Sequence, residues 1–178
     1  WNDPFSLSMG FGGGARRLPA LPDAAWFFFA SLPNHLSLYD DQPGNGQLAA
    51  TIRSVKLPSL LLAPGILSLP LLALQVTARW LRRLGRVLVR QDAVEMHLDP
   101  TKWHLYSLEW MTDRVCLRVD DRLVLESCCV PQGPLGLVLW LDNQYAALPP
   151  DGRLGYGTLA NQESWIEIKD FEIEQLKL

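Results

Sequence analysis

Residues 103–125 constrain the fold more than any other part of the chain. Residues 103–110 and 114–125 each alternate their side chains between two faces, as a half-buried β-strand does. The break at residues 111–113 is short enough for a hairpin loop, and Asp120 and Asp121 supply a second turn. The segment therefore predicts three antiparallel strands joined by tight turns.

Strand patterns also occur on both sides of this segment. Residues 25–31 form a short apolar run, typical of a strand that is buried on both faces. Residues 47–55 are rich in residues that favour strands. Residues 137–145 follow a Gly-Pro turn, and residues 164–173 alternate strictly, so we expect the latter to close the sheet. These patterns predict an all-β fold.

The order of residues in the central segment is similar to that of a known family. The pattern W-H-x-Y-x-x-E-W from Trp103, a hairpin, and V-D-x-R from Val119 resemble the central hairpins of the concanavalin A-like lectin/glucanase superfamily. That superfamily includes family 16 glycoside hydrolases and laminin G-like modules. The resemblance covers about residues 94–178 and, more loosely, 24–56, and it implies an antiparallel jelly-roll β-sandwich. We expect residues 1–178 to form this single domain. A closed barrel of the lipocalin type is the alternative that hairpins leave open.

A helical insertion at about residues 58–92 interrupts the strand pattern. Residues 57–78 carry no charge over a transmembrane length, but three prolines would break a spanning helix. Residues 70–90 then follow a helical period, with an apolar stripe and an opposite basic sector. The stripe contains Leu69, Val76, Trp80, Leu84 and Val87, and the basic sector contains Arg79, Arg82, Arg83, Arg86 and Arg90. We expect the stripe to pack on the sheet and the arginines to be solvated. A membrane surface or a protein partner for this amphipathic helix is the alternative.

Charge limits the classes of function. The formal net charge of −3 argues against a protein that binds nucleic acid by neutralising phosphates. The charge is unevenly distributed, because residues 42–91 contain seven bases and no acid, while residues 92–178 contain fifteen acids. We expect the two segments to lie against each other and to neutralise. The pattern predicts no particular oligomeric state.

Cysteine, histidine and glycine patterns exclude several kinds of site. Three cysteines do not form a disulfide framework, and adjacent Cys128 and Cys129 pair only with strain, so we favour a reducing, cytoplasmic compartment. With three histidines and no Cys-x-x-Cys motif, we expect neither a metal site nor a cofactor. The glycine-rich residues 9–14 lack the Lys-Ser/Thr of a phosphate-binding loop.

The catalytic motif of the similar hydrolases is missing. Family 16 enzymes carry E-x-D-x-x-E or E-x-D-x-E on one strand, which aims paired carboxylates into the cleft. The nearest stretch here, residues 167–172, places Glu167 and Asp170 on opposite faces of a strand. We therefore expect no glucanase activity of the family type.

Candidate site residues lie on two of the predicted strands. Trp140, Asp142 and Gln144 share one face, and an indole, a carboxylate and an amide in a row suit the floor of a cleft. A solvent-facing surface is the alternative. On the hairpin, Tyr106 and Trp110 share a row and are further ligand-binding candidates.

His104 and Asp142 are the candidates for acid/base catalysis, because imidazole titrates near neutral pH. A histidine that is hydrogen-bonded within the sheet is the alternative. Three functions remain open: a non-hydrolytic module that binds a glycan or a small, partly hydrophobic molecule, an enzyme of unfamiliar type in the same cleft, and an interaction or membrane-surface module that acts through the arginine-rich helix.

Overall fold

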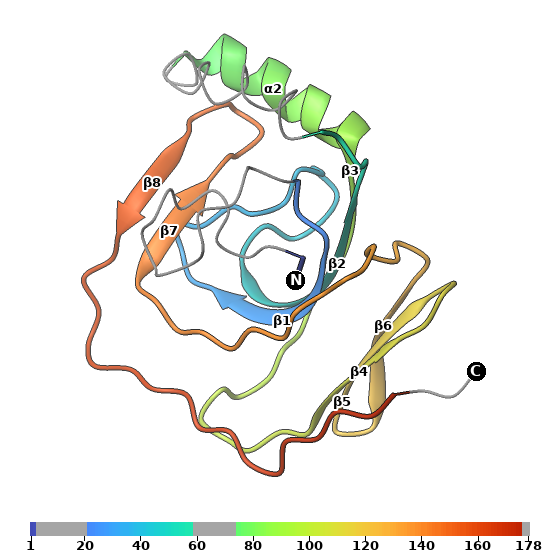
Figure 1. Ribbon diagram of the computed structural model, residues 1–178. Coiled ribbons are helices and arrows are strands. Elements are labelled where there is room, and N and C mark those ends of the chain that lie inside the picture. Colours follow the sequence, from blue (N-terminus) through green and yellow to red (C-terminus); the bar gives the residue numbers. More distant parts are fainter. Residues whose placement is uncertain (3–20, 59–73, 176–178) are drawn as a thin grey trace.

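A computed structural model describes residues 1–2, 21–58 and 74–175 of the chain. Most of the regular elements are strands in three small antiparallel sheets, and α2 (Gln75–Leu88) is the one helix among the described residues (Figure 1). The prediction of an all-β fold with a helical insertion is confirmed at this level. The glycine-rich residues 9–14 and the start of the predicted helix lie outside the described residues.

The first sheet confirms two of the predicted strands. It contains β1 (Ala24–Ala30), β2 (Gly46–Ser54) and β3 (Val89–Glu95), in that order. Phe27 of β1 pairs with Ala49 of β2, and strand alternation sends Trp26 and Phe28 to the opposite face. β1 is not buried on both faces throughout, because the side chain of Phe29 is 67% exposed.

The second sheet confirms the predicted hairpins. It contains β4 (Tyr106–Trp110), β5 (Val115–Val119) and β6 (Arg122–Ser127), in that order. The turn residues Asp120 and Asp121 have φ angles of 50° and 63°, the left-handed conformation that a two-residue hairpin turn requires. β4 begins later than predicted, so Trp103 and His104 precede the strand.

These two sheets pack against each other through an apolar core. Ala49 of β2 lies in one cluster with Val115, Leu117 and Val119 of β5, and all four are buried. Phe27 packs against this cluster, and its ring centroid lies 5.0 Å from that of Tyr106 on β4. Alternate side chains of both sheets therefore form the interior, as in a β-sandwich.

The third sheet is a separate hairpin of β7 (Gln144–Ala147) and β8 (Gly155–Thr158). The strand predicted at residues 137–145 is wrong for most of its length, because only its last two residues belong to β7. The closing strand predicted at residues 164–173 is also wrong. Residues 159–175 run down the left side and along the lower edge of Figure 1 without strand pairing, and the side chain of Trp165 is 74% exposed. Alternation forms a strand only where a neighbouring backbone supplies hydrogen bonds.

Helix α2 faces the opposite way from the prediction. Its buried residues are Ala78 and Arg82, whereas the side chains of Val76, Trp80 and Val87 are 77%, 61% and 75% exposed. The prediction that the apolar stripe packs on the sheet and that the arginines are solvated is therefore wrong for these residues. The physical reason is a set of polar partners for the inward arginines, described below. Within the described ranges, we find no helix with the length and apolar character needed to cross a membrane.

Candidate functional site

Four aromatic side chains gather on the face of β1 that points away from the core. We call Trp1, Trp26, Phe28 and Trp140 the aromatic cluster. The ring centroid of Trp26 lies 4.6 Å from those of Trp1 and Phe28 and 5.9 Å from that of Trp140. The rings of Trp1 and Trp140 are 5.7 Å apart. These separations and tilted orientations are typical of favourable aromatic packing. The cluster joins three segments that are distant in sequence.

The backbone explains how the aromatic cluster forms. Trp26 and Phe28 share a face because they are two residues apart on β1. The carbonyl oxygen of Trp1 accepts a hydrogen bond from the N–H of Gly136 at 2.9 Å, which ties the Trp1 segment to the loop that carries Trp140. None of the four rings is fully buried, and Trp140 is 39% exposed. The cluster therefore presents accessible aromatic surface.

The centre of the aromatic cluster also contains an unsatisfied donor. The Nε1–H of Trp26 is buried, and in the described part of the chain it has no hydrogen-bond acceptor. Buried donors without a partner are rare, because each forfeits the hydrogen bond that it made with water. The Trp26 donor is one of four buried side-chain polar atoms without a partner among the described residues, the others belonging to His35, Gln42 and Arg82.

Of the three residues predicted to line one strand face, only Trp140 makes ring contacts in the aromatic cluster. Asp142 is exposed, and its Oδ1 accepts a hydrogen bond from the N–H of Gln144 at 3.2 Å. This short local bond is an Asx turn that leads into β7. Gln144 is exposed at the start of β7, where it pairs with Thr158.

Tyr106 and Trp110 lie elsewhere. Both occupy β4, and both are about half exposed. The ring of Tyr106 packs against Phe27, which points to the core side of β1, whereas the aromatic cluster lies on the opposite side. The ring of Trp110 lies so close to Gly133 that a Cβ at that glycine would come within 3.0 Å of it. The structure therefore does not bring these two residues into the aromatic cluster.

His104 is held by two acceptors. Its Nδ1 lies 2.8 Å from Oδ2 of Asp120, and its Nε2 lies 3.1 Å from the carbonyl oxygen of Asp99. A carbonyl only accepts, so Nε2 carries a proton, and the carboxylate favours a second proton on Nδ1. The hydrogen bond raises the pKa of His104 and lowers the pKa of Asp120.

This histidine is therefore arranged as a structural clamp. It connects the loop before β4 to the turn between β5 and β6, and the other oxygen of Asp120 accepts the N–H of Leu105 at 3.0 Å. The two acid/base candidates have separate partners, because Asp142 bonds to Gln144. The arrangement suits a fixed imidazolium better than a proton-transfer group.

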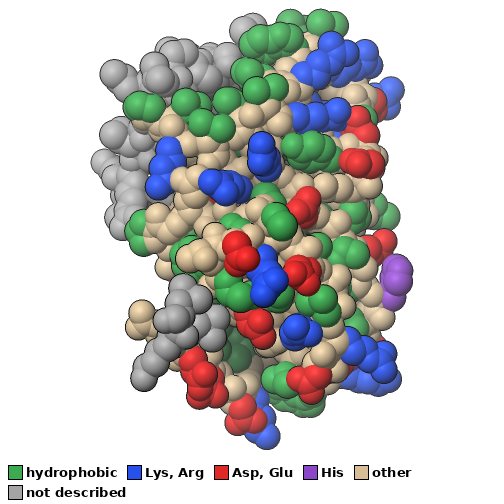
Figure 2. Space-filling view, turned by 90° about the vertical axis from the view of Figure 1, so that its right-hand side faces the viewer, with side chains coloured by type: hydrophobic (Ala, Val, Ile, Leu, Met, Phe, Trp, Pro, Cys, Tyr) green, Lys and Arg blue, Asp and Glu red, His purple; other side chains and the backbone are tan. Residues whose placement is uncertain are grey.

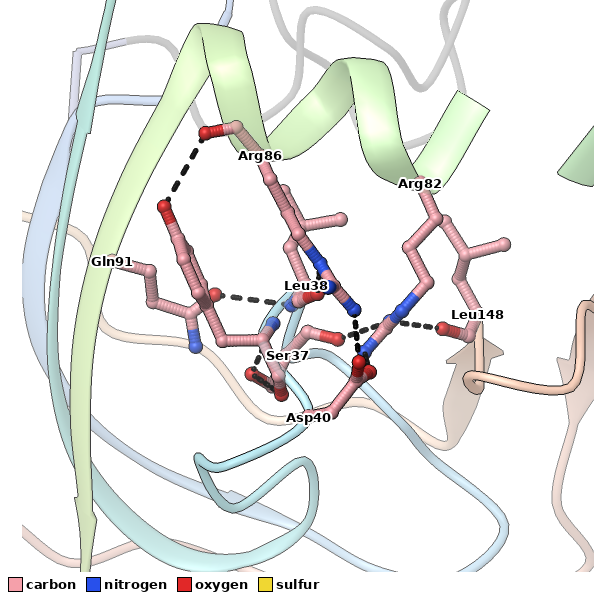
Figure 3. Close-up of polar contacts among 8 residues, drawn as sticks. Ser37, Leu38, Asp40, Arg82, Arg86, Gln91 and Leu148 are labelled. Carbon is pink, nitrogen blue, oxygen red and sulfur yellow. Dashed lines mark hydrogen bonds and ion pairs between the residues drawn. The ribbon is translucent and has the colours of Figure 1, made fainter. Parts of the chain in front are cut away.

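A buried guanidinium explains the orientation of α2 (Figure 3). The side chain of Arg82 is 3% exposed. Its Nη1 donates to the carbonyl oxygens of Ser37 and Leu148, at 2.6 Å each, and its Nη2 donates to Oδ1 of Asp40 at 2.8 Å. A buried charge is tolerated only where hydrogen bonds and a counter-charge compensate it. The partners of Nη1 and Nη2 supply both, while the buried Nε has no hydrogen-bond partner among the described residues.

Arg86, one helical turn further on, extends the same contact. Its Nε donates to the carbonyl oxygen of Leu38 at 2.7 Å, and its Nη2 pairs with Oδ2 of Asp40 at 2.5 Å. The two arginines lower the pKa of Asp40. The sequence analysis does not predict the ion pairs of Arg82 and Arg86 with Asp40. Residues 42–91 contain seven bases and no acid that could pair with them. That imbalance was the available signal, because it requires partners from outside the segment.

A small open cavity lies beside Asp23. Its volume is about 390 Å³, and Asn2, Lys56 and Gln132 are among its lining residues. Burial raises the pKa of Asp23, but its Oδ1 accepts the backbone N–H groups of Gln132 at 3.0 Å and of Ser54 at 3.4 Å. The carboxylate therefore fixes neighbouring backbone segments. Its role in the fold is accounted for by these bonds.

Comparison with known proteins adds no relative from which a role could be transferred. No family model matches the chain, and neither the curated proteins nor the solved structures contain a significant match. The function therefore has to be inferred from the residues and the geometry described above.

Proposed function

We propose that this protein is a non-hydrolytic, glycan-binding module with a jelly-roll β-sandwich of the concanavalin A-like type. The main observation in support is the aromatic cluster, in which partly exposed rings from three segments surround Trp26. Flat aromatic surfaces are well suited to stack on the apolar faces of sugar rings, while polar groups nearby orient the ligand. The packing of the first two sheets supports the sandwich part of the proposal.

Polar residues that follow Trp140 in the sequence support a ligand with hydroxyl groups. Asp142 and Gln144 follow Trp140 at two and four residues, and both side chains are exposed. A carboxylate accepts and an amide both donates and accepts, so together they match the hydroxyl groups of a sugar. A small, partly hydrophobic ligand would use the same rings with fewer of these polar contacts.

Two features support binding without hydrolysis. Retaining and inverting glycosidases need two suitably spaced carboxyl groups, and the chain has no E-x-D-x-x-E or E-x-D-x-E motif. His104, the other acid/base candidate, has both ring nitrogens engaged in hydrogen bonds. Purified protein is therefore expected to release no reducing sugar from laminarin or lichenan.

The binding site is tested by tryptophan fluorescence titration with soluble gluco-, xylo-, manno- and chito-oligosaccharides. Loss of a central aromatic contact costs about 2 kcal/mol of binding free energy, so Trp140→Ala should weaken binding roughly thirtyfold. Asp142→Asn should weaken binding with little change in melting temperature, because asparagine keeps the Oδ1 acceptor for the Gln144 N–H. Trp165→Ala is the matched control, since that exposed indole lies outside the aromatic cluster.

Three outcomes would contradict the proposal. The first is that no oligosaccharide binds, and the second is that Trp140→Ala and Trp165→Ala bind equally well. The third is ready release of reducing sugar, which would make the protein a hydrolase. The protein could instead bind an apolar probe such as a long-chain fatty acid, and no sugar, and lose this binding in Trp140→Ala. That result would support the aromatic cluster as the binding site but would show that its ligand is apolar.

A further inference from the structure

The outward face of α2 combines apolar and basic side chains. The apolar part consists of Val76, Trp80, Leu84 and Val87, all of which are exposed. Arg79 and Arg83 are also exposed, and at 100° per residue they lie beside Val76 on the same outward side. Arg90, just after the helix, is exposed as well. Hydrophobic and basic side chains meet at the top of Figure 2, the end of the molecule at which α2 lies in Figure 1.

The inward contacts of α2 do not use this apolar stripe. Arg82 and Arg86 attach the helix to the fold through Asp40 and backbone carbonyls, and Ala78 is the buried apolar residue of the helix. An apolar stripe on an amphipathic helix normally faces the protein interior, where its burial contributes to stability. Here the polar anchors leave the stripe pointing outward.

The charges on this outward face favour an anionic partner. Residues 42–91 contain no acid, and Asp40 is already shared by the two inward arginines. Nε of Arg79 donates to the backbone carbonyl of Asp151 at 2.9 Å, and the carboxylate of Asp151 pairs with Arg153. Arg83 on α2 and Arg90 at the start of β3 are both exposed, so their positive charges are accessible to solvent.

We infer that α2 docks in the plane of an anionic lipid surface. The apolar stripe would lie at the boundary between headgroups and acyl chains, and the arginines would contact lipid phosphates. Tryptophan is the side chain that favours this boundary most, which suits the outward position of Trp80. The 14 residues of α2 are too few to span a bilayer, so the helix lies on the surface. This surface is separate from the aromatic cluster, so the two proposals can fail independently.

Co-sedimentation of the full chain with vesicles tests the inference. We expect binding to vesicles of phosphatidylglycerol mixed with phosphatidylcholine, weakening as salt is raised, and much weaker binding to phosphatidylcholine alone. Trp80→Ala should lower the partition coefficient about tenfold or more, because a large apolar side chain leaves the lipid. Arg83→Gln should lower it about fivefold, the effect of one basic residue at a charged surface.

Matched controls separate docking from general effects of mutation. Trp165→Ala removes another exposed indole, and Arg122→Gln removes an exposed arginine of β6. Neither change should alter vesicle binding. Circular dichroism confirms that each variant is folded. The inference is overturned if the wild type does not bind anionic vesicles at low salt. It is equally overturned if the wild type binds anionic and phosphatidylcholine vesicles with the same affinity. It is also overturned if light scattering shows a dimer that Trp80→Ala abolishes, with no vesicle binding, since the stripe would then contact a second copy.

Discussion

At the residue scale, the ionised pair of His104 and Asp120 links stability to pH. The pKa of His104 is raised, so its contribution is fully present below the unfolded value of about 6.5 and is lost as the pH rises through the folded value. The pKa of Asp120 is lowered, so its contribution is present above the unfolded value of about 3.9 and is lost as the pH falls through the folded value. The pair therefore stabilises most between these two unfolded values.

This pH range gives a test of the ion pair between His104 and Asp120. His104→Gln should destabilise the protein more at about pH 6 than at about pH 9, because the wild-type imidazole is charged only at the lower pH. Urea denaturation at the two pH values measures the difference. His97→Gln, at an exposed position, is the control. An equal loss at both pH values would show that the ring contributes by packing alone.

The residue scale also shows which parts of the candidate site were predictable. Trp140 was identified because an aromatic residue stands out beside Asp142 and Gln144. Trp26 and Phe28 were assigned only to a buried strand, although their spacing on β1 already placed two aromatic rings on one face. The contacts of Trp26 with Trp1 and Trp140 join residues that are 25 and 114 positions away in the chain, which no local pattern specifies.

At the scale of elements, α2 shows that a helical period does not determine which face is buried. An apolar stripe opposite Arg82 and Arg86 predicts an inward stripe, because apolar burial usually dominates. In this fold, Arg82 meets two backbone carbonyls and a carboxylate, and an apolar side chain at that place would leave them unpaired. The polar partners decide the orientation.

The orientation of α2 makes opposite predictions for two neighbouring residues. Arg82→Ala should lower the free energy of unfolding by about 3 kcal/mol, because it removes charged hydrogen bonds to buried carbonyls. Trp80→Ala should change it by no more than about 0.5 kcal/mol, because the indole is mostly exposed. Chemical denaturation measures both, with Arg83→Ala as the exposed arginine control. A larger loss in Trp80→Ala than in Arg82→Ala would mean that the stripe faces inward.

At the scale of the whole molecule, a buried hydroxyl joins the first two sheets beside their apolar core. Oγ of Ser127, on β6, accepts hydrogen bonds from Oγ1 of Thr51 at 3.1 Å and from the N–H of Cys129 at 2.8 Å. It also donates to Asp92 of β3. A hydroxyl has one proton and two lone pairs, so every hydrogen-bonding capacity of this side chain is used.

Ser127→Ala should therefore affect both sheets together. It leaves Thr51, Cys129 and Asp92 without their shared partner, which should cost about 2–3 kcal/mol of unfolding free energy. Unfolding followed by tryptophan fluorescence and by far-ultraviolet circular dichroism should shift by the same amount. Ser164→Ala, on the exposed segment after β8, should cause no measurable change. Two separated transitions in Ser127→Ala would indicate that the sheets unfold independently.

The sequence by itself determined the elements whose hydrogen bonds and turns are local. Alternation and the Asp120–Asp121 pair were enough to predict the hairpins of the second sheet, because adjacent strands find each other across a short turn. The apolar run at residues 25–31 and the period of α2 likewise predicted those elements. In each case the backbone bonds of the element lie within it or to its neighbour in the chain.

The tertiary structure alone decided which surface each element meets. Residues 164–173 alternate as a strand does, but they form no strand pairing within the described part of the chain. Arg82 donates to the carbonyl groups of Ser37 and Leu148, which lie 45 and 66 residues away in the chain. These bonds turn the apolar stripe of α2 outward. The periodicity of the side chains predicts whether a segment is a helix or a strand. Which face of that element is buried depends on the long-range partners that the fold offers to each face.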